Sequence, residues 1–217
     1  MCPEASARGL VARVGRWIRE TANVRDWVAL ILPGRGYTAL GAALRFPALA
    51  LEAAGARSVV VEYADAARVV RHLGVGGAEE DGAVAEFHRA VRSNVDAAIE
   101  HARRVTVVAK SLGTVALAHL HAEAFQGSET DAIWITPLFP LPEVRRGAVS
   151  VGLRSLLVAG TADSAHHGEF HEEVRSALSA DSLLLAGADH SLEVPGLPLE
   201  SVARLRELTD AVVSFSS

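Results

Sequence analysis

The stretch RVTVVAKSLGTVALA, residues 104–118, places a serine between two apolar runs of different character. The β-branched and small side chains of residues 104–109 predict a buried strand, and the apolar spacing of residues 112–125 predicts a helix. Ser111 stands at the turn between them, with alanine and glycine two positions before and after it. A sharp strand-to-helix turn with serine at its apex is a nucleophile elbow, and its strained backbone needs small neighbours.

A second interpretation is that the serine and glycine only cap the helix that follows. The rest of the chain favours the elbow. An apolar strand over 153–159 leads to Asp163, and another over 182–186 leads to His190. Because the carboxyl ends of parallel strands lie at one edge of a sheet, we expect these two side chains to meet Ser111 there.

An earlier strand, over residues 28–32, is followed by the glycine-containing loop PGRGYT at residues 33–38. Glycines let a backbone approach a substrate carbonyl closely, so that peptide N–H groups can stabilise its developing negative charge. We expect the oxyanion hole to be formed by Arg35 and Gly36 together with the peptide N–H of Leu112, the residue after the elbow serine.

With these elements in this order, the chain resembles the α/β-hydrolase superfamily, and more narrowly the small lidless members related to dienelactone hydrolases. The resemblance rests on the elbow and on the segments PGRGY at 33–37 and GADHSL at 187–192, and it runs from about Trp27 to the C-terminus. It implies a three-layer α/β/α sandwich with a mainly parallel central sheet and no cap domain. It also implies a Ser-His-Asp triad with esterase-like chemistry, and it leaves the substrate open.

In such a triad Ser111 attacks a carbonyl carbon, and His190 takes the serine proton and passes it to the leaving group. Asp163 holds the imidazole in the correct tautomer and stabilises its charge. Asp189 and Glu193 are alternatives for the acid. We prefer Asp163 because neighbouring side chains diverge, so that Asp189 is poorly placed behind the ring of His190. The mechanism needs neither a cofactor nor a metal ion.

Several residues near this edge are candidates for substrate binding. Leu138 and Phe139 lie in a proline-rich connector after the strand over 131–136, where they form a wall for an acyl or ring group or simply cover the sheet edge. Tyr37 donates a hydrogen bond to substrate or is structural. The guanidinium of Arg35, if it faces the pocket, selects a substrate that bears a carboxylate.

Three functions are compatible with these residues. The first is hydrolysis of a carboxylic ester, thioester or lactone of modest size through an acyl-enzyme. The second is acyl transfer or cyclisation by the same triad in a biosynthetic pathway. The third is a binding or structural module of the same fold, which the intact triad disfavours. We expect a small acyl molecule as the only required partner of the site.

The histidines outside the triad suggest a metal site only weakly. His167 and His171 have the i, i+4 spacing of a helix and His166 precedes them, but cysteines and a zinc-protease pattern are missing, so a solvated helix start is the preferred interpretation. His119 and His121 lie two positions apart on the helix after the elbow and are interpreted as surface or packing residues.

Lys110, directly before the elbow serine, is the only lysine in the chain. It is placed either to pair with an acid such as Glu62 or to lie along the surface. A Ser-Lys dyad is conceivable, but His190 makes it unnecessary.

Strand and helix signals alternate along the chain, which predicts one domain over residues 1–217 with a mainly parallel sheet and helices on both faces. Residues 1–26 are uncertain, with an edge strand or a short amphipathic helix over 10–18. The remaining predicted strands cover 57–62 and 131–136, and the remaining predicted helices cover 39–54, 80–102, 167–179 and 198–214.

Composition agrees with one globular enzyme domain. Of 217 residues, 50% are hydrophobic and 22% are charged, which suits a parallel sheet buried on both faces. A net charge of −5 and a pI near 6.0 argue against nucleic-acid and anionic-membrane partners. The single cysteine, Cys2, and the arginines that interrupt the first apolar residues predict a cytoplasmic protein without disulfides. The bias toward arginine and alanine suggests a bacterial source, and we expect a monomer or a homodimer.

Overall fold

The computed structural model describes residues 26–61, 63, 82–120 and 122–217. Its centre is a six-stranded sheet in the order β2-β1-β3-β4-β5-β6, and every neighbouring pair is parallel. The strands are β1 (Trp27–Leu32), β2 (Arg57–Val60), β3 (Arg104–Lys110), β4 (Glu129–Ile135), β5 (Arg154–Gly160) and β6 (Asp181–Leu185). The strand predictions are confirmed, and the predicted three-layer architecture is found.

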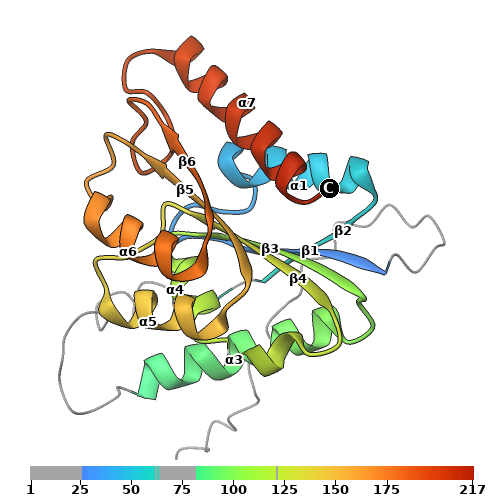
Figure 1. The fold of residues 1–217 in the computed structure, drawn as a ribbon. Helices are drawn as coiled ribbons and strands as arrows, with labels where there is room; N and C mark the ends of the chain where they lie inside the picture. Colours follow the sequence, from blue (N-terminus) through green and yellow to red (C-terminus); the bar gives the residue numbers. More distant parts are fainter. Residues whose placement is uncertain (1–25, 62, 64–81, 121) are drawn as a thin grey trace, which may run out of the picture.

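Helices cover both faces of the sheet (Figure 1). One face carries α1 (Ala42–Ala54) and α7 (Pro198–Phe215), which pack against each other. The other face carries α3 (Gly82–Ile99), α4 (Leu112–Ala118), α5 (Pro142–Val151) and α6 (Gly168–Leu178), with a short 3₁₀ helix η1 (Ala122–Phe125). Among the described helices, none combines the length and the apolar character that a membrane span requires.

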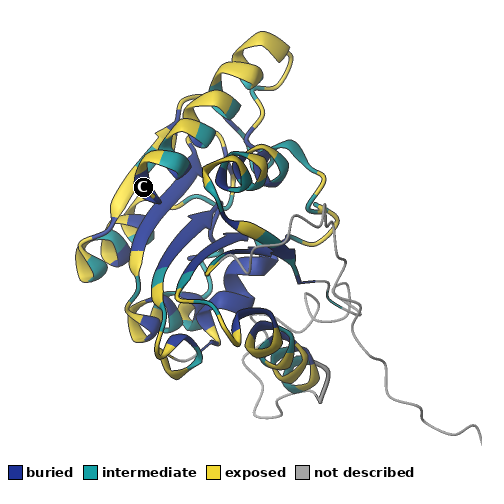
Figure 2. Cartoon of the chain, turned by 90° about the vertical axis from the view of Figure 1, so that its right-hand side faces the viewer, coloured by how far each residue is buried: buried dark blue, intermediate teal, exposed yellow. Residues whose placement is uncertain are grey.

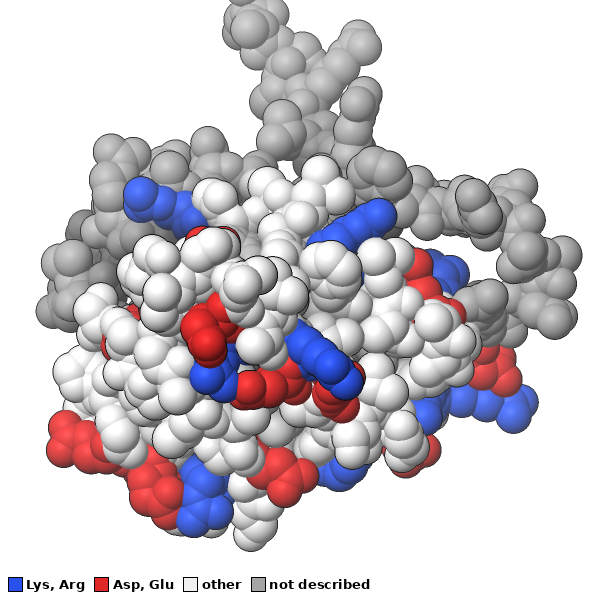
Figure 3. Space-filling model, turned by 90° about the horizontal axis from the view of Figure 1, so that it is seen from above, with Lys and Arg blue, Asp and Glu red and all other residues white. Residues whose placement is uncertain are grey.

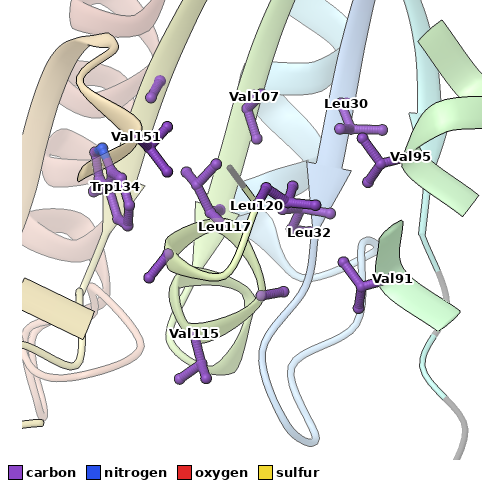
Figure 4. Packing of buried hydrophobic residues seen from close by; sticks show 14 of the residues in the cluster. Leu30, Leu32, Val91, Val95, Val107, Val115, Leu117, Leu120, Trp134 and Val151 are labelled. Carbon is purple, nitrogen blue, oxygen red and sulfur yellow. The ribbon is translucent and has the colours of Figure 1, made fainter. Parts of the chain in front are cut away.

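The sheet separates two hydrophobic clusters, because alternate strand residues point to opposite faces. Leu32 and Val107 belong to the cluster on the α4 side, together with Leu117, as Figure 4 shows from close by. Ile31 and Val108 belong to the cluster beneath α1 and α7. Figure 2 shows the result as buried strands between helices whose outer faces are exposed. The strands therefore read in the sequence as continuous apolar runs rather than as alternating ones.

One predicted helix differs from the one observed, and one helix is new. The helix expected over 112–125 ends at Ala118, and the separate 3₁₀ helix η1 covers Ala122–Phe125. The connector after β4 contains the helix α5, which was not predicted from the sequence. Pro142 lies in the first turn of α5, where a missing N–H costs nothing, so the proline-rich connector continues into a helix. In the described chain, α5 and its flanking loops make the whole connection from β4 to β5. The element expected over 10–18 lies outside the described residues.

Charged side chains of opposite sign adjoin one another on the face that Figure 3 shows. On α7, Arg204 pairs with Glu200 and Glu207, and Arg206 pairs with Asp210. Exposed pairs of this kind contribute little to stability, and they keep this face free of a concentrated single-sign field.

Candidate active site

Ser111 occupies the strained position that the elbow requires. Its φ of 50° and ψ of −112° place a non-glycine residue in a sparsely populated region, directly between β3 and α4. Its N–H donates to the carbonyl of Ile135 on β4 at 3.0 Å, and the Thr114 N–H and hydroxyl both donate to its carbonyl. The strained turn is therefore held by hydrogen bonds on both sides.

Gly113, two residues after the serine, must lack a side chain for a reason that the sequence did not reveal. A side chain at Gly113 would place its Cβ 2.0 Å from the carbonyl oxygen of Leu32 at the end of β1. The collision is with a neighbouring strand rather than across the turn itself. Gly113 therefore lets the elbow lie directly against the end of β1, where the next loop of the site begins.

Ser111, His190 and Asp163 form a continuous chain of hydrogen bonds. The Ser111 Oγ lies 2.9 Å from the His190 Nε2, and the His190 Nδ1 lies 2.8 Å from the Asp163 Oδ2. The Asp163 side chain is 1% exposed, whereas the His190 side chain is 41% exposed. The carboxylate thus lies behind a ring that remains open to solvent.

The electrostatics of Asp163 fix the proton arrangement. Burial alone would raise the pKa of its carboxyl, but hydrogen bonds from His190 and from the Ala165 N–H, with the charges of His190 and Lys110, lower the pKa below its usual value. An ionised carboxylate only accepts hydrogen bonds, so the His190 Nδ1 carries the proton. The Nε2 is then free to accept the hydroxyl proton of Ser111.

The loops after β5 and β6 are joined by hydrogen bonds of their main chains. These bonds explain why Asp163 and His190, 27 positions apart in sequence, meet. A side chain at Gly160 would place its Cβ 2.1 Å from the carbonyl oxygen of Ala188. The Ala162 N–H donates to the same carbonyl at 2.9 Å, and the Gly187 N–H donates to the Thr161 hydroxyl at 2.8 Å.

Asp189 organises the loop that carries His190. Its Oδ1 accepts the N–H groups of Ser191 at 2.8 Å and Glu193 at 3.1 Å, and its own N–H donates to the Glu193 carbonyl. Leu192 completes the turn with a φ of 64°. The structure therefore gives the Asp189 carboxylate a local role and leaves Asp163 next to the ring. An aspartate whose side chain accepts the N–H two residues later is a recognisable turn signal, which the sequence analysis did not use.

The loop after β1 lies against the serine at Gly34, a residue that was not among the predicted oxyanion-hole residues. A Cβ at Gly34 would lie 3.2 Å from the Ser111 Cβ. Arg35 and Gly36 follow on the exposed side, and Gly36 has a φ of 69°. Leu112 begins α4, where the first N–H groups have no acceptor within the helix. These residues thus border the serine from two elements.

Tyr37 has structural contacts. Its hydroxyl accepts the Ala43 N–H at 2.9 Å at the start of α1, and its ring covers Gly41 so closely that a Cβ there would lie 2.4 Å away. Burial raises the pKa of Tyr37, the hydrogen bond from Ala43 opposes this, and the nearby carboxylates of Glu193 and Asp189 add to the rise. Its contacts match the structural alternative.

Leu138 and Phe139 differ in exposure. Phe139 is buried, with its ring centroid 6.3 Å from those of Trp134 and His171. Leu138 is half-buried and packs against the same hydrophobic cluster, and its N–H donates to the Thr114 hydroxyl at 3.2 Å. The connector is thus tied to the elbow, and Leu138 is the more accessible of the two side chains.

The interpretation of the 166–171 histidines as a solvated helix start is wrong for His171. The first turn of α6 directs His171 inward, where its Nε2 lies 2.8 Å from the Ser182 Oγ of β6. Burial, reinforced by His166, lowers the pKa of His171 to about 4. His166 packs edge-on against it at 5.2 Å between centroids. Across the described ranges, no three potential metal ligands come together.

His119, interpreted as a surface or packing residue, is exposed and has its ring against another histidine, a partner that the sequence did not indicate. Its ring stacks on that of His88 from α3, with centroids 3.5 Å apart and planes 29° apart. Burial, and secondarily His119, lowers the pKa of His88 to about 4. His121 and Glu62 lie outside the described residues.

Comparison with solved structures identifies the fold. Est1E from Butyrivibrio proteoclasticus, solved with ferulic acid, is 13% identical with a TM-score of 0.65, and the match covers 87% of each chain. A dienelactone hydrolase from Anabaena variabilis is 17% identical with a TM-score of 0.62 over 90% of this chain and 89% of that one.

A third structure, XC6422 from Xanthomonas campestris, is described as an α/β serine hydrolase without a lid. It is 17% identical with a TM-score of 0.57 over 89% of this chain and 82% of that one. No protein-family model and no curated protein matches the sequence. At these identities the likeness establishes the α/β-hydrolase fold.

Proposed function

We propose that this protein is a serine hydrolase that cleaves a small carboxylic ester, thioester or lactone. The observation that carries the proposal is the hydrogen-bond chain from the Ser111 Oγ through the His190 imidazole to the Asp163 carboxylate, at 2.9 and 2.8 Å. Such a chain raises the nucleophilicity of a serine, which is unreactive by itself.

The reaction begins when Ser111 attacks the substrate carbonyl and His190 accepts the hydroxyl proton. Asp163 stabilises the imidazolium that forms. The N–H groups of Leu112 and of the 34–36 loop stabilise the oxyanion. Collapse of this intermediate releases the alcohol or thiol, which takes the proton from His190, and leaves an acyl group on Ser111. Water, activated by His190, then releases the acid.

The exposure of the site favours hydrolysis over acyl transfer. With 41% of the His190 side chain open to solvent, water reaches the ring from outside. Transfer to another acceptor requires that water be kept out. The substrate is presented at the surface, next to Leu138 and the exposed Arg35. The ferulic acid bound to Est1E and the lactone chemistry in the name of the Anabaena relative suggest aromatic esters and small lactones as first substrates.

Fluorophosphonate labelling followed by intact mass measurement tests the proposal. We expect one adduct on the wild-type chain and none on Ser111→Ala or His190→Ala. Ser191→Ala is the matched control, because it removes an adjacent hydroxyl and should keep the adduct. A folded wild-type protein without an adduct, or an adduct that survives Ser111→Ala, would contradict the proposal.

A further inference from the structure

Lys110 is fully buried at the end of β3, one residue before the elbow serine. Burying an ammonium group is costly unless it has hydrogen-bond partners. Burial lowers the pKa of the Lys110 ammonium to about 8, because the charged form is costly away from water. The negative charges of Asp163 and Asp189 act in the opposite direction and raise this pKa. An apolar side chain of similar length would fill the space without that cost, so the charge itself calls for an explanation.

The ammonium of Lys110 contacts three other segments of the site. Its Nζ donates to the His190 carbonyl at 2.6 Å and to the Thr136 hydroxyl at 2.9 Å, and it lies 4.6 Å from the centre of the Tyr37 ring. Those residues follow β6, β4 and β1 respectively, while Lys110 belongs to β3. One side chain of β3 therefore contacts the segments that follow three other strands. The Lys110 ammonium donates to the His190 carbonyl and the Thr136 hydroxyl, whereas the Ser111 hydroxyl bonds to the His190 ring. Lys110 and Ser111 therefore do not form a Ser-Lys dyad.

We propose that Lys110 is a positioning residue, whose buried ammonium fixes the main chain at His190 and thereby sets the imidazole at bonding distance from Ser111. The proposal rests on the roles given above to those two residues. His190 then has two anchors, since Asp163 holds its ring and Lys110 holds its carbonyl. Hydrogen bonds from a charged donor are shorter and stronger than neutral ones.

The charged groups that face Lys110 come from two loops. Asp163 follows β5 and Asp189 follows β6, and both favour the ammonium form. The other facing groups, the Tyr37 ring and the Thr136 hydroxyl, are uncharged contacts. Loss of the Lys110 proton in mildly alkaline solution therefore weakens the bond to the His190 carbonyl and loosens the ring. Lys110 does not touch the reacting atoms, so its removal should lower kcat and leave KM unchanged.

The test compares Lys110→Met with the wild type by two measurements. The first is kcat and KM on an activated aryl ester, for which we expect kcat to fall about tenfold to a hundredfold, because small misplacements of catalytic groups are costly. The second is the low-field proton NMR signal of the His190 Nδ1–H, recorded in a Ser111→Ala background. We expect this signal to broaden or vanish in Lys110→Met.

Ser155→Ala is the matched control. It removes two hydrogen bonds of the Ser155 hydroxyl in the same sheet, which accepts the Trp134 indole N–H and donates to the Leu153 carbonyl, away from the site. We expect it to keep both the kcat and the NMR signal. A Lys110→Met protein with wild-type kcat and a sharp His190 signal would overturn the proposal.

Thr136→Val provides a second test if Lys110→Met does not fold. It removes one acceptor from the ammonium and retains a β-branched side chain of similar size. With fewer partners the ammonium is easier to deprotonate, so the alkaline loss of the His190 signal should move to lower pH. An unmoved transition would overturn the proposal.

The NMR measurement does not depend on turnover, so the two proposals fail separately. Absence of a fluorophosphonate adduct refutes the hydrolase, whereas a His190 signal indifferent to Lys110 refutes the positioning role.

Discussion

Two histidines near Asp163 have opposite environments. The His190 side chain is partly open to solvent, and both of its ring nitrogens have partners, Ser111 and Asp163. His171 is buried and lines the hollow that reaches Asp163, and its Nδ1 has no hydrogen-bond partner among the described residues. Nearness to the carboxylate therefore does not distinguish the histidine that we propose as the catalytic base. The selection follows from which ring the carboxylate bonds to and which ring solvent and substrate can reach.

The largest effect should come from removing the carboxylate that distinguishes the two rings. Asp163→Asn replaces an acceptor by a group that also donates, so it no longer fixes the proton on the His190 Nδ1. We expect kcat/KM to fall by roughly 10³ to 10⁴-fold with the fold retained, measured by steady-state kinetics and circular dichroism.

Asp189→Asn is its matched control. An asparagine oxygen can still accept the N–H groups of Ser191 and Glu193, so we expect near wild-type kcat/KM. An active Asp163→Asn beside an inactive Asp189→Asn would reverse the assignment of the acid.

The neutrality of His171 gives the next effect. Because its folded-state pKa of about 4 lies below the usual histidine value, the unfolded chain takes up a proton first as the pH falls through about 6. Stability contributed by neutral His171 is thus present at pH 7 and lost toward pH 4. His171→Gln cannot titrate, so its deficit in unfolding free energy relative to wild type should shrink between pH 7 and pH 5, as measured by urea denaturation. A deficit that stays constant with pH would mean that the pKa of His171 is the same in the folded and the unfolded chain.

A smaller loss of stability should follow Ser182→Ala. This change removes the one hydrogen-bond partner that the His171 ring has among the described residues, and Ser182 is an exposed strand position. We expect a loss of about 1 kcal/mol in unfolding free energy and unchanged kcat/KM, since the triad is untouched. A large loss of activity would show that the two histidines are coupled.

The smallest expected effect is that of metal ions. In wild type and in the His167→Ala, His171→Gln double variant, a chelator or added Zn²⁺ should leave fluorophosphonate labelling rates unchanged. A rate that depends on Zn²⁺ in wild type and not in the double variant would restore the metal-site interpretation.

The parts of the site that could be predicted from the sequence are those with local signals. Ser111, Asp163 and His190 each lie in the turn or loop that follows an apolar run, and parallel pairing brings the ends of such runs together. The structure brings these three side chains together as expected. The fold was predictable for the same reason, since strands buried on both faces produce uninterrupted apolar segments.

What could not be predicted depends on contacts between distant segments. The need for glycine at Gly113 and Gly160 comes from carbonyls of other strands and loops. The inward direction of His171 depends on its contact with Ser182 of β6, and the burial of Lys110 depends on its contacts with the loops after β1, β4 and β6. A periodic pattern marks which positions are apolar, but it does not show which polar side chain the tertiary fold will enclose. The helix α5 was missed because the proline-rich connector was interpreted only as a wall for substrate or a cover for the sheet edge, and Pro142 was not considered as a helix start.

The contact between Gly113 and the Leu32 carbonyl also bears on how this scaffold can be altered. The elbow packs against the end of β1 so closely that Gly113 has no room for a methyl group. A substitution at Gly113 therefore cannot be used to shift the elbow. Variation in what the protein accepts must therefore be introduced at the outer rim, through the exposed Arg35 and the connector around Leu138. A library of variants for new substrates should randomise the rim residues and keep the elbow with Gly113 unchanged.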